Sequence, residues 1–283
     1  MNIVVCIKQV PDSAQIRVHP VTNTIMRQGV PTIINPYDLF SLEAALQLRD
    51  QTGGTVTVLT MGPPMAEDAL RKALGIGADR AVLLTDRFFA GSDTLATSYA
   101  LSMAISKLAS ERPVDLVFCG KQTIDGDTAQ VGPGIACRLG LNQLTYITSI
   151  EGLDAQAREI TVQRRAEGGV QVLKTKLPCM VTMLEGSNAI RRGSMPSVLR
   201  AARQPIATWN AAAAGIEDVT RCGLRGSPTV VKKVFAPKPR ADKAKLIAVA
   251  NRGTADIAND AVEAIFAAAP KLHTDMLGRA AQA

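Results

Sequence analysis

The sequence predicts an α/β fold in which a parallel sheet has helices on both faces. Apolar runs of strand length alternate with helical stretches through the first 140 residues, and this alternation is typical of parallel sheets. Polar, Gly-rich and Pro-rich segments follow the expected strands, at residues 8–12, 61–64, 84–97 and 120–132. Parallel sheets bind ligands outside the carboxyl ends of their strands, so these four segments are the expected site.

The strands expected in the first half are residues 3–8, 55–61, 81–84 and 115–119. The first is a short apolar run, and the second is rich in the β-branched residues that favour strands. The first helix is opened by Asn35-Pro36-Tyr37-Asp38 and closed by Gly53-Gly54. Further helices are expected at residues 66–74, 93–110 and 130–139.

After residue 143 the pattern changes to consecutive strands. They are expected at residues 143–150, 159–166, 169–176 and 179–184, and they predict an antiparallel extension of the sheet. From residue 185 the chain reads as irregular and basic, apart from an amphipathic helix at residues 256–269. We therefore expect an α/β domain over residues 1–185 and an extended arm with a terminal helix over residues 186–283.

Charge is unevenly divided along the 283 residues. The formal net charge is +7, yet residues 1–150 hold 12 basic and 13 acidic residues, whereas residues 151–283 hold 20 and 12. The excess lies in residues 187–252, which hold 13 basic and 3 acidic side chains. A basic arm is suited to binding another protein or an acidic partner. Nucleic acid is disfavoured, because the aromatic residues that stack on bases make up only 4%.

The cysteines and histidines of the sequence limit which metal sites and catalytic groups can be expected. The five cysteines are widely scattered, which is typical of a reducing cytoplasm and gives no metal-binding spacing. Two histidines predict neither a His-based metal site nor a Ser-His-Asp triad. The N-terminal apolar run is too short for a signal peptide, and no apolar run is long enough to span a membrane. We expect a cytoplasmic protein without a catalytic side chain, a bound metal or a membrane span.

The segment from Gly120 to Gly134 carries the densest ligand-binding signals. It follows an expected strand, runs into a helix and reads GKQTIDGDTAQVGPG. Glycines let the backbone approach a ligand, and amides at a helix N-terminus favour a phosphate. It matches neither the Walker A nor the Gly-x-Gly-x-x-Gly pattern. An ordinary strand-to-helix turn capped by Asp explains it equally well.

Other polar residues near the strand ends can also be interpreted either as structural or as ligand-binding. Asp125 and Asp127 are spaced as a pair of carboxylates that could act in acid–base catalysis or bind Mg²⁺. The sequence offers no third metal ligand beside them, so helix capping and hydrogen bonds to a ribose are the favoured interpretation. Asp93 and Thr94 fit a plain N-cap or a second set of phosphate donors. Cys6 reads as a small buried hydrophobe.

Together, several segments resemble the β subunit of an electron-transfer flavoprotein. They are VVCIKQVPD at residues 4–12, NPYD at 35–38, TMGP at 60–63, GIGADR at 75–80, CGKQTIDGDTAQVGP at 119–133 and KLPCMVT at 176–182. The resemblance runs from residue 1 to about residue 240. It implies a Rossmann-like, adenine-nucleotide-hydrolase-like sheet with an antiparallel strand extension, and an extended C-terminal arm that embraces an α subunit.

One kind of β subunit in this family holds AMP, and a bifurcating or nitrogen-fixation-associated (Fix-type) kind holds FAD in the same place. The chain is similar to the FAD-holding kind in its DGDTAQVGP loop, in DTLATS at residues 93–98, and in GSPT at residues 226–229 followed by VVKKVFAP. FAD is therefore the expected cofactor, and AMP is the alternative.

The resemblance also implies where the cofactor lies. Its adenosine part is expected at Cys6, Asn35, Pro36, Tyr37, Asp38 and Met61. Its phosphates are expected at Asp125, Gly126, Asp127, Thr128, Ala129, Gln130, Val131, Gly132, Pro133, Gly134, Ile135 and Ala136. The flavin part needs further polar donors, and Thr94, Thr97, Ser227 and Thr229 are available for it.

The function implied is flavin-based electron bifurcation in a heterodimer with an α subunit. NADH would reduce the FAD of this chain. One electron would pass through the α-subunit FAD to a high-potential acceptor, an acyl-CoA dehydrogenase or quinone oxidoreductase, and the other to ferredoxin or flavodoxin. The alternative is a non-bifurcating subunit that holds structural AMP and moves electrons between a dehydrogenase and a quinone reductase.

The resemblance places a partner-docking loop at residues 187–203. In the family this loop docks acyl-CoA dehydrogenases, but Ser187 stands near the place of the expected docking leucine, so the acceptor or its docking is expected to differ. A nucleotide-binding regulator like the universal stress proteins would share the strand–helix alternation. Its Gly-x2-Gly-x9-Gly-Ser/Thr loop is absent from the sequence.

Overall fold

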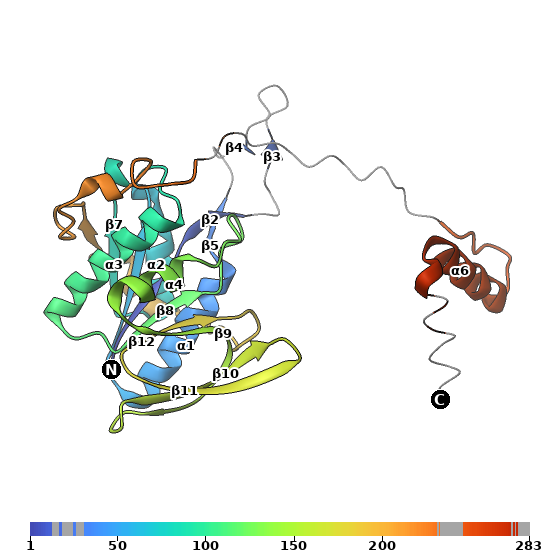
Figure 1. Ribbon diagram of the computed structural model, residues 1–283, viewed down its shortest axis with the longest axis horizontal. Helices are drawn as coiled ribbons and strands as arrows, with labels where there is room; N and C mark the ends of the chain where they lie inside the picture. The colour runs from blue at the N-terminus through green and yellow to red at the C-terminus, as the bar shows by residue number, and fades with distance from the viewer. Residues whose placement is uncertain are drawn as a thin grey trace. The chain divides into compact units, whose positions relative to one another are not determined.

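The computed structural model describes residues 1–12, 17–18, 25–26, 31–230, 232, 246–272, 274 and 276. The chain divides into two compact units, Met1–Phe235 and Ala236–Ala283, which are taken separately here (Figure 1).

A nine-stranded sheet forms the centre of the first unit, in the order β11-β10-β9-β12-β8-β1-β6-β7-β13. The strands are β1 (Asn2–Cys6), β6 (Thr55–Met61), β7 (Arg80–Leu84), β8 (Leu116–Gly120), β9 (Asn142–Asp154), β10 (Glu159–Ala166), β11 (Gly169–Lys176), β12 (Cys179–Met183) and β13 (Ala207–Trp209). In the stretch β9-β12-β8-β1-β6-β7-β13 each strand is parallel to its neighbours. At the other end of the sheet, β10 pairs antiparallel with both β9 and β11. The predicted parallel sheet with an antiparallel extension is confirmed.

Helices cover both faces of this sheet. The helices α1 (Pro36–Thr52), α2 (Glu67–Ile76) and α5 (Met195–Arg203) contribute to one apolar core, and α3 (Thr94–Glu111) and α4 (Val131–Leu139) to the other. Side chains alternate between the two cores along the fully buried strand β1, with Val5 in the first and Val4 in the second. This double burial explains why β1 is apolar at nearly every position.

Shorter elements complete the unit. Two small antiparallel pairs join β2 (Gln9–Pro11) with β5 (Thr32–Ile34), and β3 (Arg17–Val18) with β4 (Ile25–Met26). Single-turn 3₁₀ helices in the described part of this unit are η2 (Pro64–Ala66), η3 (Arg87–Phe89) and η4 (Val219–Arg221).

Local sequence signals account for most element boundaries. The strands β6, β10 and β11 occupy the residues that the sequence predicts. Helix α1 starts with proline after Asn35 and ends at Gly53, whose φ of 74° suits glycine. Helix α3 starts after Asp93, whose carboxylate accepts hydrogen bonds from the N–H groups of Leu95 and Ala96.

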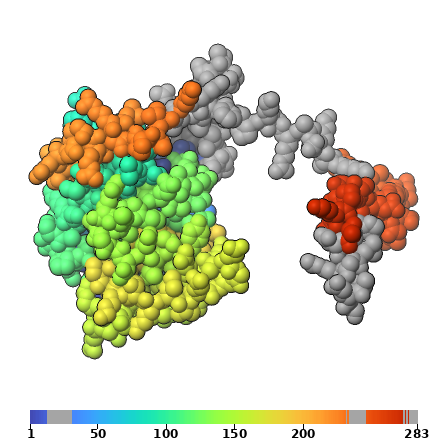
Figure 2. Space-filling model, in the orientation of Figure 1, coloured from blue at the N-terminus to red at the C-terminus, as the bar shows by residue number. Residues whose placement is uncertain are grey.

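The expected division after residue 185 differs from the observed one. Helix α5 packs on α2 with Ala201 buried, and β13 pairs with β7 at the edge of the sheet. Figure 2 shows the orange part of the chain lying against the body of the first unit. Residues 186–230 are therefore part of this unit, and the expectation of an extended arm starting at residue 186 does not hold for them. Most of the VVKKVFAP motif, at residues 231 and 233–237, lies outside the described residues.

The second unit contains helix α6 (Thr254–Ala268), close to the helix expected at residues 256–269. Arg252 pairs with Asp260 at 2.6 Å beside its first turns. Across the ranges that the structure describes, we find no helix with the length and apolar character needed to cross a bilayer.

Candidate functional site

The topological switch of the sheet lies between β1 and β8. The chain builds β1, β6 and β7 in one direction and then returns to place β8 on the other side of β1. In open α/β sheets such a switch opens a crevice at the carboxyl ends of the two strands. The residues that follow β1 and β8 are therefore the walls of the candidate site.

The first turn of α1 fixes both strand ends. The Asp38 carboxylate accepts hydrogen bonds from the N–H groups of Lys8 (2.7 Å) and Gly120 (3.1 Å). The Asn35 side chain donates to the Gln122 carbonyl (2.8 Å) and accepts from the Ile124 N–H (3.1 Å). Two residues of the predicted NPYD segment thus hold the residues after β1 and the loop after β8 in place.

Asp38 is buried beneath this crevice. Burial raises the pKa of its carboxyl from 3.8 to about 7, although hydrogen bonds from Asn35, Lys8 and Gly120 act in the opposite direction. Gly120 must be glycine here, because a Cβ at this position would lie 2.4 Å from Asp38 Oδ1. The end of β8 is therefore packed directly against the start of α1.

An ion pair links the two walls of the crevice. Lys8 Nζ lies 2.9 and 2.8 Å from the two carboxylate oxygens of Asp125. Burial acts to raise the pKa of Asp125, but the hydrogen bonds and charge of Lys8 outweigh it and hold that pKa below its ordinary value. Lys8 lies in the predicted site segment 8–12 but was not named among the cofactor-binding residues, although its place directly after the first strand is a signal that could have singled it out.

The loop between β8 and α4 has an unusual backbone. Asp127 and Ala129 have φ values of 52° and 55°, a left-handed conformation that non-glycine residues adopt at a cost of about 1 kcal/mol or more. The Asp127 carboxylate accepts a hydrogen bond from Gln122 Nε2 at 2.8 Å, which supports this shape. Backbone that mixes left- and right-handed residues forms concavities whose N–H groups bind anions.

Helix α4 continues this cradle. Gln130 occupies its N-cap but makes no side-chain hydrogen bond to the helix backbone; instead its Oε1 accepts from the Thr94 hydroxyl at 2.8 Å. Pro133 has no N–H, and the Gly134 N–H donates to the Gln130 carbonyl, so the first-turn N–H groups without an intrahelical acceptor are those of Val131 and Gly132, which are suited to a phosphate.

Four of the predicted phosphate-site residues also have packing roles. A Cβ on Gly132 would lie 2.9 Å from Thr182 Cγ2, and one on Gly134 would lie 2.7 Å from Ser98 Oγ. Ile135 and Ala136 are buried in the core that α3 and α4 share. These side-chain positions face protein, so any part they take in binding is through the main chain and the placement of α4.

A second polar group lies at the start of α3. One oxygen of the Asp93 carboxylate caps the helix, and the other accepts from the N–H (3.2 Å) and hydroxyl (2.8 Å) of Thr229. The Ser227 hydroxyl accepts from the Asp93 N–H at 2.8 Å and donates to the Gly223 carbonyl at 2.6 Å. The structure thus brings the predicted Ser227 and Thr229 to α3, where their hydroxyls tether the two segments. Thr97 lies half-buried in the same first turn.

The Thr94–Gln130 hydrogen bond joins the α3 group to the α4 cradle. Residues far apart in the sequence therefore form one continuous polar edge above β1, β8 and the starts of α3 and α4. Met61 ends β6 in this row of strand ends, and Cys6 ends β1 beside it.

Cys6 and Cys119 are buried at the ends of the neighbouring strands β1 and β8. A hydrogen bond with Cys6 and burial together raise the pKa of the Cys119 thiol well above its ordinary value. A thiol in this state is a poor nucleophile, and both cysteines are packed in the apolar core beneath α3 and α4. Among the residues that the structure describes, no three potential metal ligands converge.

Two tyrosines flank Lys121, which lies in the predicted segment 120–132 but was not named among the cofactor-binding residues. Lys121 Nζ lies 5.7 Å from the ring centre of Tyr37 and 5.3 Å from that of Tyr146, within the range of cation–π contacts. Tyr146 has a left-handed φ of 61°, where its N–H donates to the Thr182 hydroxyl. No sequence signal indicates this conformation, because it depends on the pairing of β9 with β12.

Replacing Asp93 by alanine is expected to lower the free energy of unfolding by about 1–2 kcal/mol, because the N-cap of α3 and its bond to Thr229 are both lost. Urea unfolding followed by circular dichroism measures this. Thr229→Val is the control that keeps the cap and removes only the hydroxyl bond. A loss in D93A no larger than that in T229V would show that the cap contributes nothing.

Comparison with known proteins identifies relatives of the chain. Residues 22–214 match the family model described as the electron transfer flavoprotein domain. The chain is 69% identical over 277 residues to Protein FixA of Sinorhizobium fredii, covering 98% of this chain and 97% of that protein. It is 62% identical over 280 residues to Protein FixA of Azotobacter vinelandii, covering 99% and 100%. It is also 46% identical over 244 residues to the electron transfer flavoprotein subunit beta of Megasphaera elsdenii, covering 85% and 89%.

Proposed function

The chain belongs to the electron transfer flavoprotein family, as a Fix-type β subunit that pairs with an α subunit, and from this premise we propose that it binds FAD and serves flavin-based electron bifurcation. The family binds flavin or AMP at this subunit; the choice of FAD, the use of NADH and the identity of the acceptors are parts of the proposal.

The uncapped first turn of α4, joined to the left-handed loop at Asp127 and Ala129, is the observation that carries this proposal. Its amides suit the pyrophosphate of a dinucleotide. The adenosine part would lie against Cys6, Met61 and the Asn35–Asp38 turn, because these residues share the same row of strand ends.

The length of the polar edge favours FAD over AMP. A mononucleotide needs only the Asn35–Asp38 turn and the α4 cradle. The edge continues through the Thr94–Gln130 bond to Asp93, Ser227 and Thr229. The hydroxyls of Ser227 and Thr229 donate to protein acceptors, so toward a longer ligand they would act as hydrogen-bond acceptors.

When bound, FAD would supply hydride acceptance from NADH and single-electron transfer to the α-subunit flavin and to ferredoxin or flavodoxin. The residues of this chain bind and orient it. The Lys8 ammonium, which is paired with Asp125, ties the loop after β8 to the end of β1, and the buried thiols of Cys6 and Cys119 supply an apolar floor. The free, scattered cysteines support a cytoplasmic location.

Counting cofactors in the purified heterodimer tests the choice of ligand. Two FAD molecules per heterodimer are expected. One FAD and one AMP would contradict the proposal and favour the alternative, a non-bifurcating subunit with structural AMP.

Anaerobic titration with NADH tests bifurcation itself. With ferredoxin or flavodoxin and a high-potential acceptor both present, the two are expected to be reduced together. If the low-potential carrier stays oxidised while the acceptor is reduced, bifurcation is wrong even with two FAD molecules bound.

The acceptor, an acyl-CoA dehydrogenase or quinone oxidoreductase, is proposed to dock on residues 187–203. Helix α5 lies in this segment and exposes large apolar side chains, with Met195 71% and Leu199 56% exposed. Such side chains on a helix that is packed on its other face are typical of a contact surface.

A further inference from the structure

We infer that a small cavity at the amino ends of β1, β6 and β7 binds a short-chain monocarboxylate, with Arg112 and Thr57 as its polar contacts. The cavity lies away from the cofactor crevice. Thr55 lines the cavity and Met61 lies at the crevice, at the two ends of β6, and a strand of this length spans about 20 Å. The ligand is therefore a molecule other than the cofactor.

The cavity has a volume of about 250 Å³ and lies between the starts of the three strands and the end of α3. Pockets for drug-sized ligands begin at about 300 Å³, whereas an apolar cavity of about 150 Å³ holds benzene. A ligand of about six to ten non-hydrogen atoms therefore fits this cavity.

Thr57 gives the cavity a polar group that the fold does not use. The residue lines the cavity and is only 2% exposed. Within the described ranges of the chain, its hydroxyl has no hydrogen-bond partner. Buried polar groups are costly when they stay unpaired, so a ligand oxygen that pairs with this hydroxyl is favoured.

The guanidinium group of Arg112 supplies positive charge. Its Nη1 donates to the Thr55 hydroxyl at 3.0 Å, and among the residues that the structure describes it has no acidic partner. Arg80 also lines the cavity, but its Nη2 is paired with Glu111 at 3.1 Å. Two positive charges and one negative charge leave a single positive charge, which a monoanion balances. Guanidinium groups bind carboxylates through paired hydrogen bonds.

The end of α3 is compatible with an anion, although helix C-terminal carbonyl groups generally repel one. The Leu108 carbonyl accepts from the Arg112 N–H, and the Asn2 side chain donates to the carbonyls of Arg112 (2.9 Å) and Pro113 (3.1 Å). The other lining side chains, Val4 and Leu108, are buried and apolar. They suit a hydrocarbon tail, so a carboxylate with a short tail fits better than a phosphate.

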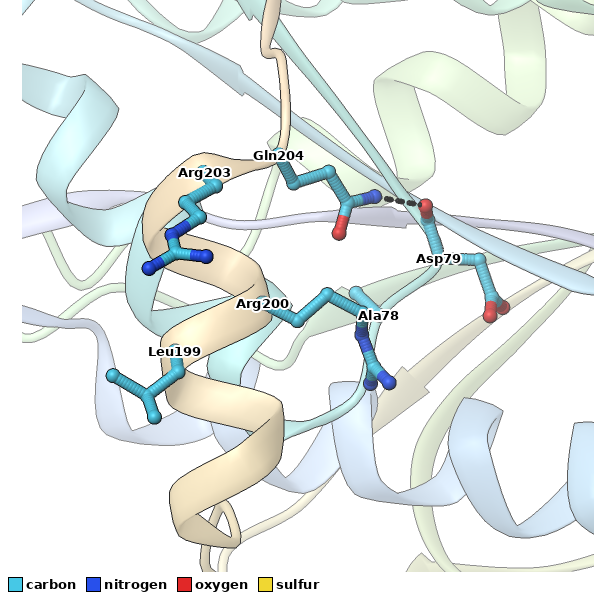
Figure 3. Close-up of a pocket in the computed structure, with 6 residues that line it drawn as sticks. All are labelled: Ala78, Asp79, Leu199, Arg200, Arg203 and Gln204. Carbon is cyan, nitrogen blue, oxygen red and sulfur yellow. Dashed lines mark hydrogen bonds between the residues drawn. The ribbon is translucent and has the colours of Figure 1, made fainter.

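Contacts of the preceding residue, Asp79, fix the position of Arg80. Gln204 Nε2 donates to the Asp79 carbonyl at 2.6 Å (Figure 3). The Asp79 carboxylate accepts from Arg49 Nη1 (3.0 Å) and from the Val56 N–H (2.8 Å), so it is already engaged. Walls that are in place before binding lose little conformational entropy, which favours the ligand.

Calorimetric titration of the purified heterodimer with butyrate, in a buffer without other carboxylates, tests the inference. Butyrate is expected to bind with a Kd in the millimolar range or below. Butyramide has the same shape without the charge, and inorganic phosphate has charge without the tail. Each is expected to bind about tenfold more weakly than butyrate, or weaker still.

Four variants of this chain locate the site. Arg112→Met is expected to raise the Kd for butyrate about tenfold or more. Thr57→Val removes only the unpaired hydroxyl, so it is expected to raise the Kd about threefold without lowering the temperature of unfolding. Glu111→Gln frees Arg80 and is expected to lower the Kd. Arg87→Met, at an exposed arginine on η3 beyond the carboxyl end of β7, is the matched control and is expected to bind butyrate like the wild type.

Butyramide or phosphate that binds as tightly as butyrate would overturn the inference, and so would the absence of binding at millimolar butyrate. An R112M variant that binds butyrate as tightly as R87M would also overturn it. The proposed function would still stand, because cofactor content and electron transfer are measured separately.

Discussion

Replacing Arg191 by methionine is expected to lower the free energy of unfolding of the first unit by about 3 kcal/mol, because it leaves a buried carboxylate without its partner. Glu43 lies in the middle of α1 with only 4% of its side chain exposed. Both its oxygens accept hydrogen bonds from the Arg191 guanidinium, at 2.8 and 3.1 Å, and one also accepts from the Arg191 N–H. Urea unfolding of the chain measures the loss.

The double variant E43Q/R191M separates a stranded charge from lost packing. It contains no charge at either position, so it is expected to recover most of the stability that R191M loses. R192M removes the neighbouring exposed arginine and is expected to cost less than about 0.5 kcal/mol. If R191M is no less stable than R192M, the Glu43–Arg191 pair does not hold residues 187–203 on α1.

The same pair shows why sequence reasoning misjudged the chain after residue 185. Arg191 reads as one of 13 basic residues in a stretch with few acidic ones, and its partner lies 148 positions earlier. The region is also held by the pairing of β13 with β7 and by buried side chains at Ala201, Ala211, Ala214, Ile216 and Cys222. These anchors are irregularly spaced along the sequence and show no hydrophobic period, and composition alone then predicts an arm.

Elements with strong local signals were predicted well. The β-branched run of β6, the proline and glycine at the two ends of α1 and the Asp93 cap of α3 depend on neighbouring residues. The contacts of the candidate site divide in the same way. The NPYD turn and the loop after β8 stand out as motifs, but the Lys8–Asp125 and Asp93–Thr229 contacts join segments more than 100 residues apart. Only the folded sheet order brings these together.

Replacing Asp38 by asparagine is expected to flatten the dependence of stability on pH between about pH 4 and pH 7. In the folded chain burial raises the pKa of Asp38 to about 7, whereas its ordinary value is 3.8. Between these values the folded state binds more protons than the unfolded state, so the free energy of unfolding falls as pH rises. The contribution of Asp38 is complete below pH 4 and lost above pH 7. One pH unit corresponds to about 1.4 kcal/mol, which makes about 4 kcal/mol the upper limit.

Urea unfolding of the wild type and D38N at roughly pH 4.5, 5.5 and 6.5 measures this difference in slope. D68N, which changes an exposed carboxyl on α2, is the matched control and is expected to follow the wild type. Asparagine also weakens the bonds to the Lys8 and Gly120 N–H groups, so D38N will be less stable overall. That loss involves no titrating group and lowers the D38N values equally at every pH, whereas the buried charge changes the slope. Parallel curves for wild type and D38N would mean that Asp38 ionises alike in both states, and the burial of its carboxyl beneath the crevice would then have no electrostatic cost.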